Sequence, residues 1–138
     1  MSSTNAPAPS SPSGSNMSEA EAFLAKYPDV EAIDIILTDF HGIGRGKMIR
    51  RHELEGFYKS GRGLPTSIFG QDVTGEDVDD CGLVQTGGGG DGRCWPVPGT
   101  LGYLPHTGRG QLLISMYNED ATPHDVDPRN VFLNQVKR

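Results

Sequence analysis

The sequence predicts an α+β domain in which a helix packs on one face of a short mixed sheet. Residues 31–38 place Ile33, Ile35 and Leu37 on one face, which is the period of two that a strand requires. Residues 111–117 are apolar on both faces, as in a central strand. Glycine and proline supply 19 and 10 of the 138 residues, so turns are frequent and an all-helical bundle is excluded.

The predicted elements begin after a tail. Residues 1–17 are almost all small, polar or proline residues, which bury too little apolar surface to offset the cost of ordering their backbone, so we expect a disordered tail. Ser18 and Glu21 then form a capping-box pattern that predicts a helix of about two turns, ending at Tyr27-Pro28. Translation that starts at Met17 is an alternative to a start at Met1.

A hairpin and a second helix follow. The strand at 31–38 leads through turn residues 39–42 into a second extended segment at 43–51, which predicts two antiparallel strands. Residues 52–59 predict a short helix that ends at a glycine. The hairpin and this helix form the first half of the predicted sheet domain.

The second half contains more loops. Two brief strand candidates, 83–84 and 94–97, lie on either side of a glycine-rich turn and precede the strand at 111–117. Asp127 and Pro128 predict the cap and the first position of a closing helix, where the missing N–H of proline has no cost. This order of elements fits the β-grasp arrangement.

Composition excludes several classes of partner. The chain has 18 acidic and 12 basic side chains and a net charge of -6, with no domain-wide basic surface, so nucleic acid is not an expected partner. No apolar segment approaches the roughly 20 residues that cross a bilayer, so no membrane is expected either. The N-terminus lacks the basic and apolar parts of a secretory signal, which predicts a cytoplasmic protein with both cysteines reduced.

The glycine-rich segment 42–48 does not match a phosphate-binding loop. His41 stands where such a loop needs glycine, and methionine follows the lysine in place of Ser or Thr. Arg45 and Lys47 are candidates for contact with an anion or a partner. The other interpretation, which includes Arg51, is a solvated cationic face that protects a sheet edge.

Signals for a metal or a nucleophile are weak. The four histidines lack the spacing of zinc ligands, and the acidic run at 72–80 lacks the calcium-loop pattern and predicts a solvated loop. Ser67, Ser115 and Cys94 are candidate nucleophiles without a local histidine partner. We therefore expect no metal site and no catalytic residue on this chain.

Four motifs, in order along the chain, resemble the N-terminal domain of the glutamine synthetase family, and in particular its γ-glutamylpolyamine synthetase branch. They are D-x-x-G-x-x-R-G-K at 39–47, LPTSIF at 64–69, CWPVP-x-TL at 94–101 and DPR at 127–129. The resemblance extends over residues 20–138.

This resemblance implies a ligase that uses ATP to convert glutamate into γ-glutamyl phosphate, which an amine then attacks. It implies that ATP and Mg or Mn bind to a large C-terminal domain, so residues 18–126 would be the β-grasp domain and 127–138 the start of a linking helix. It further implies a ring homo-oligomer in which this domain forms one wall of a neighbour's active site. The chain alone is expected to bind no cofactor and to be inactive.

The loop after the short helix implies the kind of amine. Family members that use ammonia read Phe-Asp-Gly-Ser-Ser there, and the matching residues here are 64–68, so Pro65 replaces the acid. Proline neither accepts a proton nor binds a cation. The resemblance therefore implies a larger amine, such as a polyamine, beside an amine-side loop of Pro65, Thr66, Ser67 and Ile68.

Two other classes of function stay open from the sequence. One is a free-standing β-grasp module that binds a partner protein through its exposed strand face. The other is a regulatory domain that binds an anion through Arg45 and Lys47.

Overall fold

A computed structural model describes residues 11–76 and 91–136 of the chain. Its helices are α1 (Met17–Lys26), α2 (Leu54–Ser60) and α3 (Pro128–Val136), and its 3₁₀ turns are η1 (Arg51–Glu53) and η2 (Thr66–Gly70). Its strands are β1 (Ala32–Thr38), β2 (Gly44–Arg50), β3 (Arg62–Pro65), β4 (Asp91–Pro96), β5 (Gly102–Leu104) and β6 (Arg109–Tyr117).

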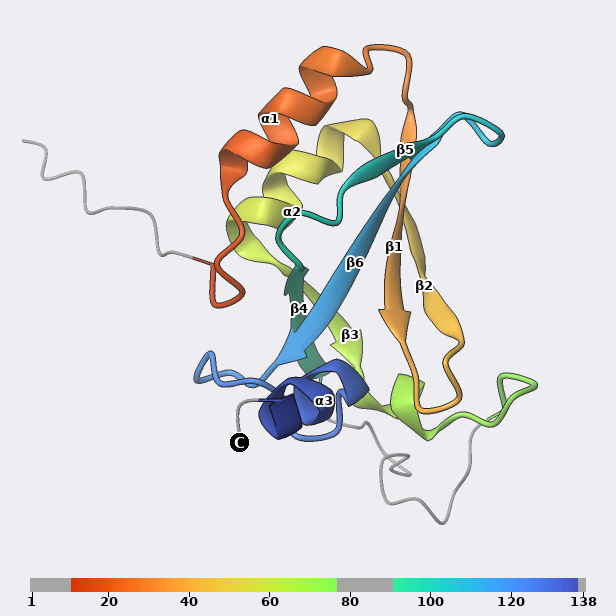
Figure 1. The fold of residues 1–138 in the computed structure, drawn as a ribbon, viewed down its shortest axis with the longest axis vertical. Coiled ribbons are helices and arrows are strands. Elements are labelled where there is room, and N and C mark those ends of the chain that lie inside the picture. Colours follow the sequence, from red (N-terminus) through yellow and green to blue (C-terminus); the bar gives the residue numbers. More distant parts are fainter. Residues whose placement is uncertain (1–10, 77–90, 137–138) are drawn as a thin grey trace, which may run out of the picture.

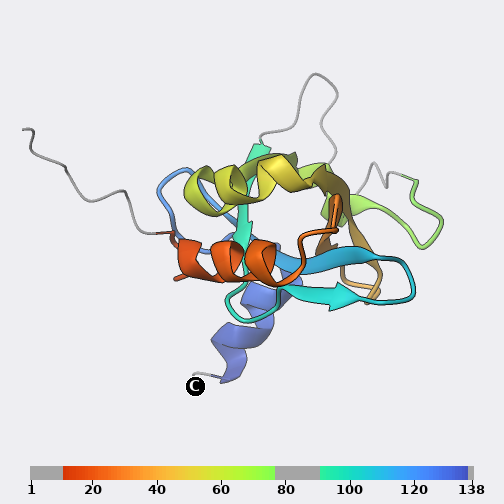
Figure 2. The ribbon, with the colours of Figure 1, turned by 90° about the horizontal axis from the view of Figure 1, so that it is seen from above.

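The strands form one mixed sheet in the order β2-β1-β6-β4-β3, with β5 also paired to β6 (Figure 1). The pairing of β1 with β6 is parallel, and the other strand pairs are antiparallel. Helices α1 and α2 pack side by side, and Figure 2 shows them together, with α3 projecting away from them. The predicted α+β class with helices against a curled mixed sheet is confirmed.

Strand β6 connects the two halves of this sheet. Its residues 110–113 pair with β1, and its residues 114–117 pair with β4. Leu112, Ile114 and Met116 are fully buried, in agreement with the central position that their pattern predicts. The core therefore lies between β6, its neighbours β1 and β4, and the two helices, and it includes Phe23, Leu54 and Phe57.

The predicted capping box of the first helix is wrong. Helix α1 begins at Met17, two residues before the start that a Ser18 cap predicts, and Asn16 is its cap, with the side chain accepting a hydrogen bond from the Ser18 amide at 2.9 Å. Ser18 therefore lies inside the first turn. Asparagine accepts from a free amide at a helix start as well as serine does, and the structure uses Asn16 in place of Ser18. The cap therefore lies two residues earlier than predicted.

Arg51 is not part of a solvated cationic face. Its guanidinium donates to the carbonyl oxygens of Leu24, Tyr27 and Val30 at distances of 2.7 to 3.0 Å. These groups lie at the end of α1 and in the turn that follows it, where helix carbonyls lack partners within the helix. Arg51 thus closes α1 and connects it to the hairpin.

Two short strands are absent from the sequence prediction. Strand β3 lies in the stretch expected to be loop and pairs with β4, while β5 pairs with the first part of β6. The strand predicted at 43–51 runs over 44–50, and that predicted at 94–97 runs over 91–96. The predicted strand at 83–84, the turn at 87–90 and the first ten residues of the predicted tail lie outside the described residues.

The predicted cap of the last helix is confirmed. One carboxylate oxygen of Asp127 accepts from the Arg129 amide at 3.0 Å, and the other accepts from the Met116 amide at 2.8 Å. Asn130 adds hydrogen bonds to the carbonyls of Met116 and His124. Burial raises the pKa of Asp127, although the two amides partly oppose this. Asp127 therefore joins α3 directly to β6.

Gly46 is the position where a side chain would damage the hairpin most. A Cβ there would overlap the carbonyl oxygen of Ile35 on β1. We predict that Gly46→Ala lowers the free energy of unfolding by at least about 2 kcal/mol, because the backbone must shift to make room. Gly63→Ala on β3 is the matched control, since a Cβ there meets no atom within 4 Å. Equal urea midpoints for both variants would contradict this prediction.

Candidate functional site

A groove of about 410 Å³ lies between β2 and the segment that runs from β3 through η2. It brings together two sets of residues that the sequence separates by about 20 positions. Its lining residues are Arg45, Gly46, Lys47, Leu64, Pro65, Ser67, Ile68 and Gln71. Five of the six predicted site residues line it, while Thr66 lies in η2 beside them. This groove is the candidate site.

Local structure explains how the amine-side loop reaches the groove. Leu64 and Phe69 are buried and anchor the two ends of the loop in the core. Pro65 has extended backbone angles, φ -68° and ψ 139°, and its fixed φ suits the position before the 3₁₀ turn. The residues between these anchors, Ser67 among them, are consequently held at the surface of the groove.

Asp39 closes the turn between β1 and β2. Its carboxylate accepts hydrogen bonds from the amides of His41 and Ile43, both at 2.9 Å, while Gly42 adopts the positive φ that the turn requires. Burial alone would raise the pKa of Asp39, but the hydrogen bonds from Arg45 and from the two amides outweigh it and hold the pKa below its ordinary value. Asp39 is therefore a carboxylate stabilised in its charged form.

Arg45 is mostly buried at the wall of the groove, and the prediction that it lies on a solvated cationic face is wrong. Its side chain is 13% exposed, and its Nε lies 2.5 Å from Oδ2 of Asp39. Its Nη1 donates to the side chain of Gln71 at 3.0 Å, and its Nη2 donates to the carbonyl of Asp72 at 2.5 Å. Pattern analysis missed Gln71, because its partner is 26 residues away.

Lys47 differs from Arg45 although both lie on β2. Its side chain is exposed, and among the ion pairs of the described residues none includes it. Since Asp39 offsets the charge of Arg45, Lys47 supplies the net positive charge of the groove. Among the described residues, the groove lining contains no carboxylate.

Only one of the three candidate nucleophiles lines the groove. Ser67 is half-buried there, whereas Ser115 and Cys94 are buried in the sheet. Burial raises the pKa of the Cys94 thiol to about 12, with a smaller contribution from the charge of Asp127, so the reactive thiolate is suppressed. Cys94 is therefore a core residue.

The acidic run does not form a cation site in the part that is described. Asp72 uses its Oδ1 to accept from the Thr74 amide and hydroxyl and from the Glu76 amide, which closes a tight loop. The remaining acids of the run, at 77, 79 and 80, lie outside the described residues. Over 11–76 and 91–136, no group of three His, Cys, Asp or Glu side chains is placed to hold a metal ion.

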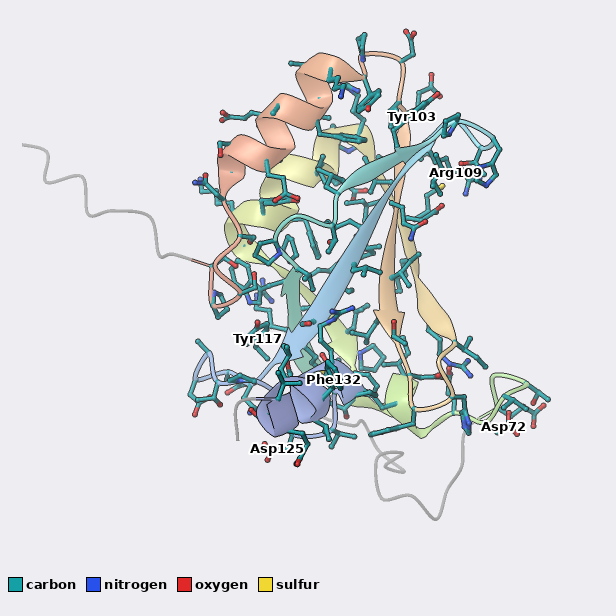
Figure 3. The ribbon with its side chains drawn as sticks, viewed as in Figure 1. Asp72, Tyr103, Arg109, Tyr117, Asp125 and Phe132 are labelled. Atoms are coloured by element: carbon teal, nitrogen blue, oxygen red, sulfur yellow. The ribbon has the colours of Figure 1, made fainter. Side chains whose placement is uncertain are left out.

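Figure 3 shows that Asp72 lies on a loop at the end of the molecule where the β1–β2 turn also lies, and that Phe132 lies on α3. Tyr103 and Arg109 are at the opposite end.

Among the helices of residues 11–76 and 91–136, none has the length and apolar composition of a membrane-spanning segment.

Comparison with known proteins identifies a relative. No protein-family model matches this chain. The chain is 39% identical over 122 residues to γ-glutamylputrescine synthetase PuuA of Escherichia coli K12, and the match covers 86% of this chain and 25% of that protein. The chain thus spans about a quarter of the length of this curated relative.

Solved structures share the fold. A novel glutamine synthase homolog aligns with a TM-score of 0.64 at 23% identity, covering 79% of this chain and 26% of its own. GmaS in complex with ADP aligns at 0.62 and 22% identity, covering 83% and 24%. Plasmodium falciparum glutamine synthetase aligns at 0.63 and 16% identity, covering 89% and 22%. Each match again corresponds to about a quarter of the larger chain.

Asp39 makes stability depend on pH with a defined sign. Because its folded pKa is lowered, its contribution is complete above the unfolded value of about 4 and is lost as the pH falls through the folded value. We predict that Asp39→Asn lowers the free energy of unfolding by about 3 kcal/mol at pH 7, since Arg45 loses its buried partner. The difference from wild type should shrink below about pH 4.

Urea denaturation at pH 7, 5 and 3 measures this difference. The control is Asp34→Asn, which removes an exposed ion pair to Arg109 and should cost less than about 1 kcal/mol. A cost for Asp39→Asn that is the same at all three pH values would refute the assignment.

Proposed function

We propose that this chain carries a domain of the glutamine synthetase family, and that it is the N-terminal β-grasp portion of an ATP-dependent carboxylate–amine ligase that forms γ-glutamyl amides. The observation that carries this proposal is the 39% identity over 122 residues to a γ-glutamylputrescine synthetase. The groove supports it, because the predicted amine-side loop and the β2 cations line the same surface.

We propose that the groove is one wall of an active site shared between subunits of a ring homo-oligomer. Pro65 and Ile68 offer apolar surface, and Ser67 offers a hydroxyl group. The carbon chain of an alkyl amine can pack against the apolar side chains, whereas the side chain of Pro65 offers no acceptor for an ammonium ion. The proposed amine is therefore larger than ammonia, with a polyamine as the first candidate.

In the proposed reaction the amine nitrogen attacks the γ-acyl carbon of γ-glutamyl phosphate, phosphate leaves, and the nitrogen loses a proton. Only the neutral amine is a nucleophile. The exposed cation of Lys47 disfavours a second positive charge nearby and therefore favours the neutral form of an amine bound in the groove. The part assigned to this chain is to orient the amine and to exclude water.

The described residues of the groove do not fit a divalent metal ion. Mg²⁺ prefers oxygen ligands, commonly carboxylates, and the lining residues within 11–76 and 91–136 supply two cations, one amide and one hydroxyl but no carboxylate. We therefore propose that ATP and Mg or Mn, together with glutamate, are held by parts of the enzyme that this chain does not contain.

A second candidate is an interaction module without catalysis. The observation that favours it is the apolar surface of α3, where Phe132 and Val136 are 66% and 64% exposed and Val131 and Leu133 are 41% and 44% exposed. A surface of this kind is typical of a protein contact site. The two candidates differ in whether the complete polypeptide forms an amide.

An activity assay separates them. The complete polypeptide encoded by the reading frame that contains this chain is incubated with glutamate, ATP, Mg²⁺ and either putrescine or ammonia, and the γ-glutamyl amide is measured by mass spectrometry. We predict amide formation with putrescine faster than with ammonia, and none with the 138-residue chain alone. Absence of amide with every amine would refute the ligase proposal.

Pro65→Asp tests the amine-side assignment within the same assay. A carboxylate at position 65 would bind an ammonium ion and would also remove apolar surface from the carbon chain of putrescine, so the ratio of kcat/KM for ammonia to that for putrescine should rise roughly tenfold. Pro98→Asp is the matched control, because Pro98 is also exposed but lies in the loop between β4 and β5. An equal change in both variants would show that position 65 has no special role.

A further inference from the structure

Arg45 connects two parts of the chain that are far apart in sequence. Each of its three guanidinium nitrogens donates one hydrogen bond, to Asp39 on one side and to Gln71 and Asp72 on the other. Asp39 belongs to the turn of the β1–β2 hairpin, whereas Gln71 and Asp72 follow η2 directly. Arg45 and Gln71 both line the groove.

We infer that Arg45 is a positioning residue, which fixes the segment after η2 against the β1–β2 hairpin and so sets the distance between the two walls of the groove. One wall is β2, which carries Lys47, and the other carries Ser67 and Gln71. The role of the groove in amide formation rests on the proposed function. The attachment of its walls to each other rests on the geometry alone.

The geometry argues against the earlier candidate role of Arg45 as an anion contact. Its side chain is only 13% exposed, and its charge is paired with a carboxylate that is 2% exposed. An anion in the groove would have to compete with Asp39, which is already held by two backbone amides. Lys47 is exposed and unpaired within the described part, so it is the residue that meets a bound group.

The segment that Arg45 holds is itself well defined. Asp72 forms a backbone hydrogen bond from its amide to the carbonyl of Glu76 at 2.8 Å, and its carboxylate accepts from Thr74 and Glu76 within the same loop. Gly75 lies close to the guanidinium, since a Cβ there would be 3.5 Å from Nη1. Arg45 thus attaches a closed loop of residues 72–76 as a unit.

Arg45→Lys tests this role without removing the buried charge. Lysine keeps a cation near Asp39 but has one ammonium group in place of the planar fork, so it cannot also reach Gln71 and Asp72. In the 138-residue chain we expect the amides of residues 72–76 to exchange with deuterium roughly tenfold faster or more, because two hydrogen bonds to the loop are lost. The amides of β6 should change much less.

Arg62→Lys is the matched control, because Arg62 makes an exposed ion pair of 3.9 Å with Glu53 and does not line the groove. Gln71→Ala is the second variant, which removes one acceptor far from Asp39 and should give a smaller increase in the same loop. Unchanged exchange at 72–76 in Arg45→Lys would overturn the inference. An equal increase in the loop and in β6 would overturn it too, because it would indicate only a general loss of stability.

Kinetics of the complete polypeptide give the second readout. Misplacing one wall should raise KM for the amine and lower kcat/KM roughly tenfold or more in Arg45→Lys, with Arg62→Lys unchanged. Faster loop exchange with unchanged kinetic constants would overturn the positioning role. If the wild-type polypeptide forms no amide, the proposed function fails, and the exchange experiment still decides whether Arg45 fixes the loop.

Discussion

The pairing of β6 along both edges is the constraint on which the remaining structure depends. Its first half is held between β1 and β5, and its second half pairs with β4, so a single strand carries the hairpin side and the β3–β4 side of the sheet. Its close packing is visible at Gly110, where a Cβ would press on Ile33 and on Phe23 of α1. The same strand also receives α3 through the Met116 amide. The sheet, the two packed helices and α3 are therefore all attached to β6.

The candidate site is a product of this arrangement, because β2 and β3 stand at the two ends of the strand order β2-β1-β6-β4-β3 and belong to separate parts of the chain. The sheet alone does not hold the segment after β3 against the hairpin. An edge-to-face contact between Phe40 and Phe69, with ring centroids 6.5 Å apart, joins the two, and polar contacts add to it, with Asp39 shaping the turn and Arg45 extending from it to Gln71 and Asp72. A buried charge pair is costly unless its hydrogen bonds are satisfied, and here the carboxylate has three donors. Stability and the shape of the groove are thus coupled at one ion pair.

The parts of the fold that the sequence predicts are those with a local signal. The alternation in β1, the two apolar faces of β6 and the Asp127-Pro128 cap each depend on residues within a few positions of one another. Strand β3 has four residues and exists because it pairs with β4, from which it is separated by a long stretch of chain, so its own residues carry no periodic signal. The burial of Arg45 is not predicted for a related reason, since two of its three partners, Gln71 and Asp72, are 26 and 27 residues away. The site residues at 65–68 came from the family resemblance and not from any spacing rule.

Cys94 gives this sheet a chemical reporter. It lies on β4 opposite Arg62 of β3 and Met116 of β6, and no part of it is accessible to solvent. Thiol reagents attack the thiolate, which burial suppresses here, so alkylation has to wait for β4 to separate from its neighbours. In a Cys81→Ser background, the rate of labelling would report how often β4 opens. The Cys94 thiol would then measure the opening of the contacts of β4 with β3 and β6.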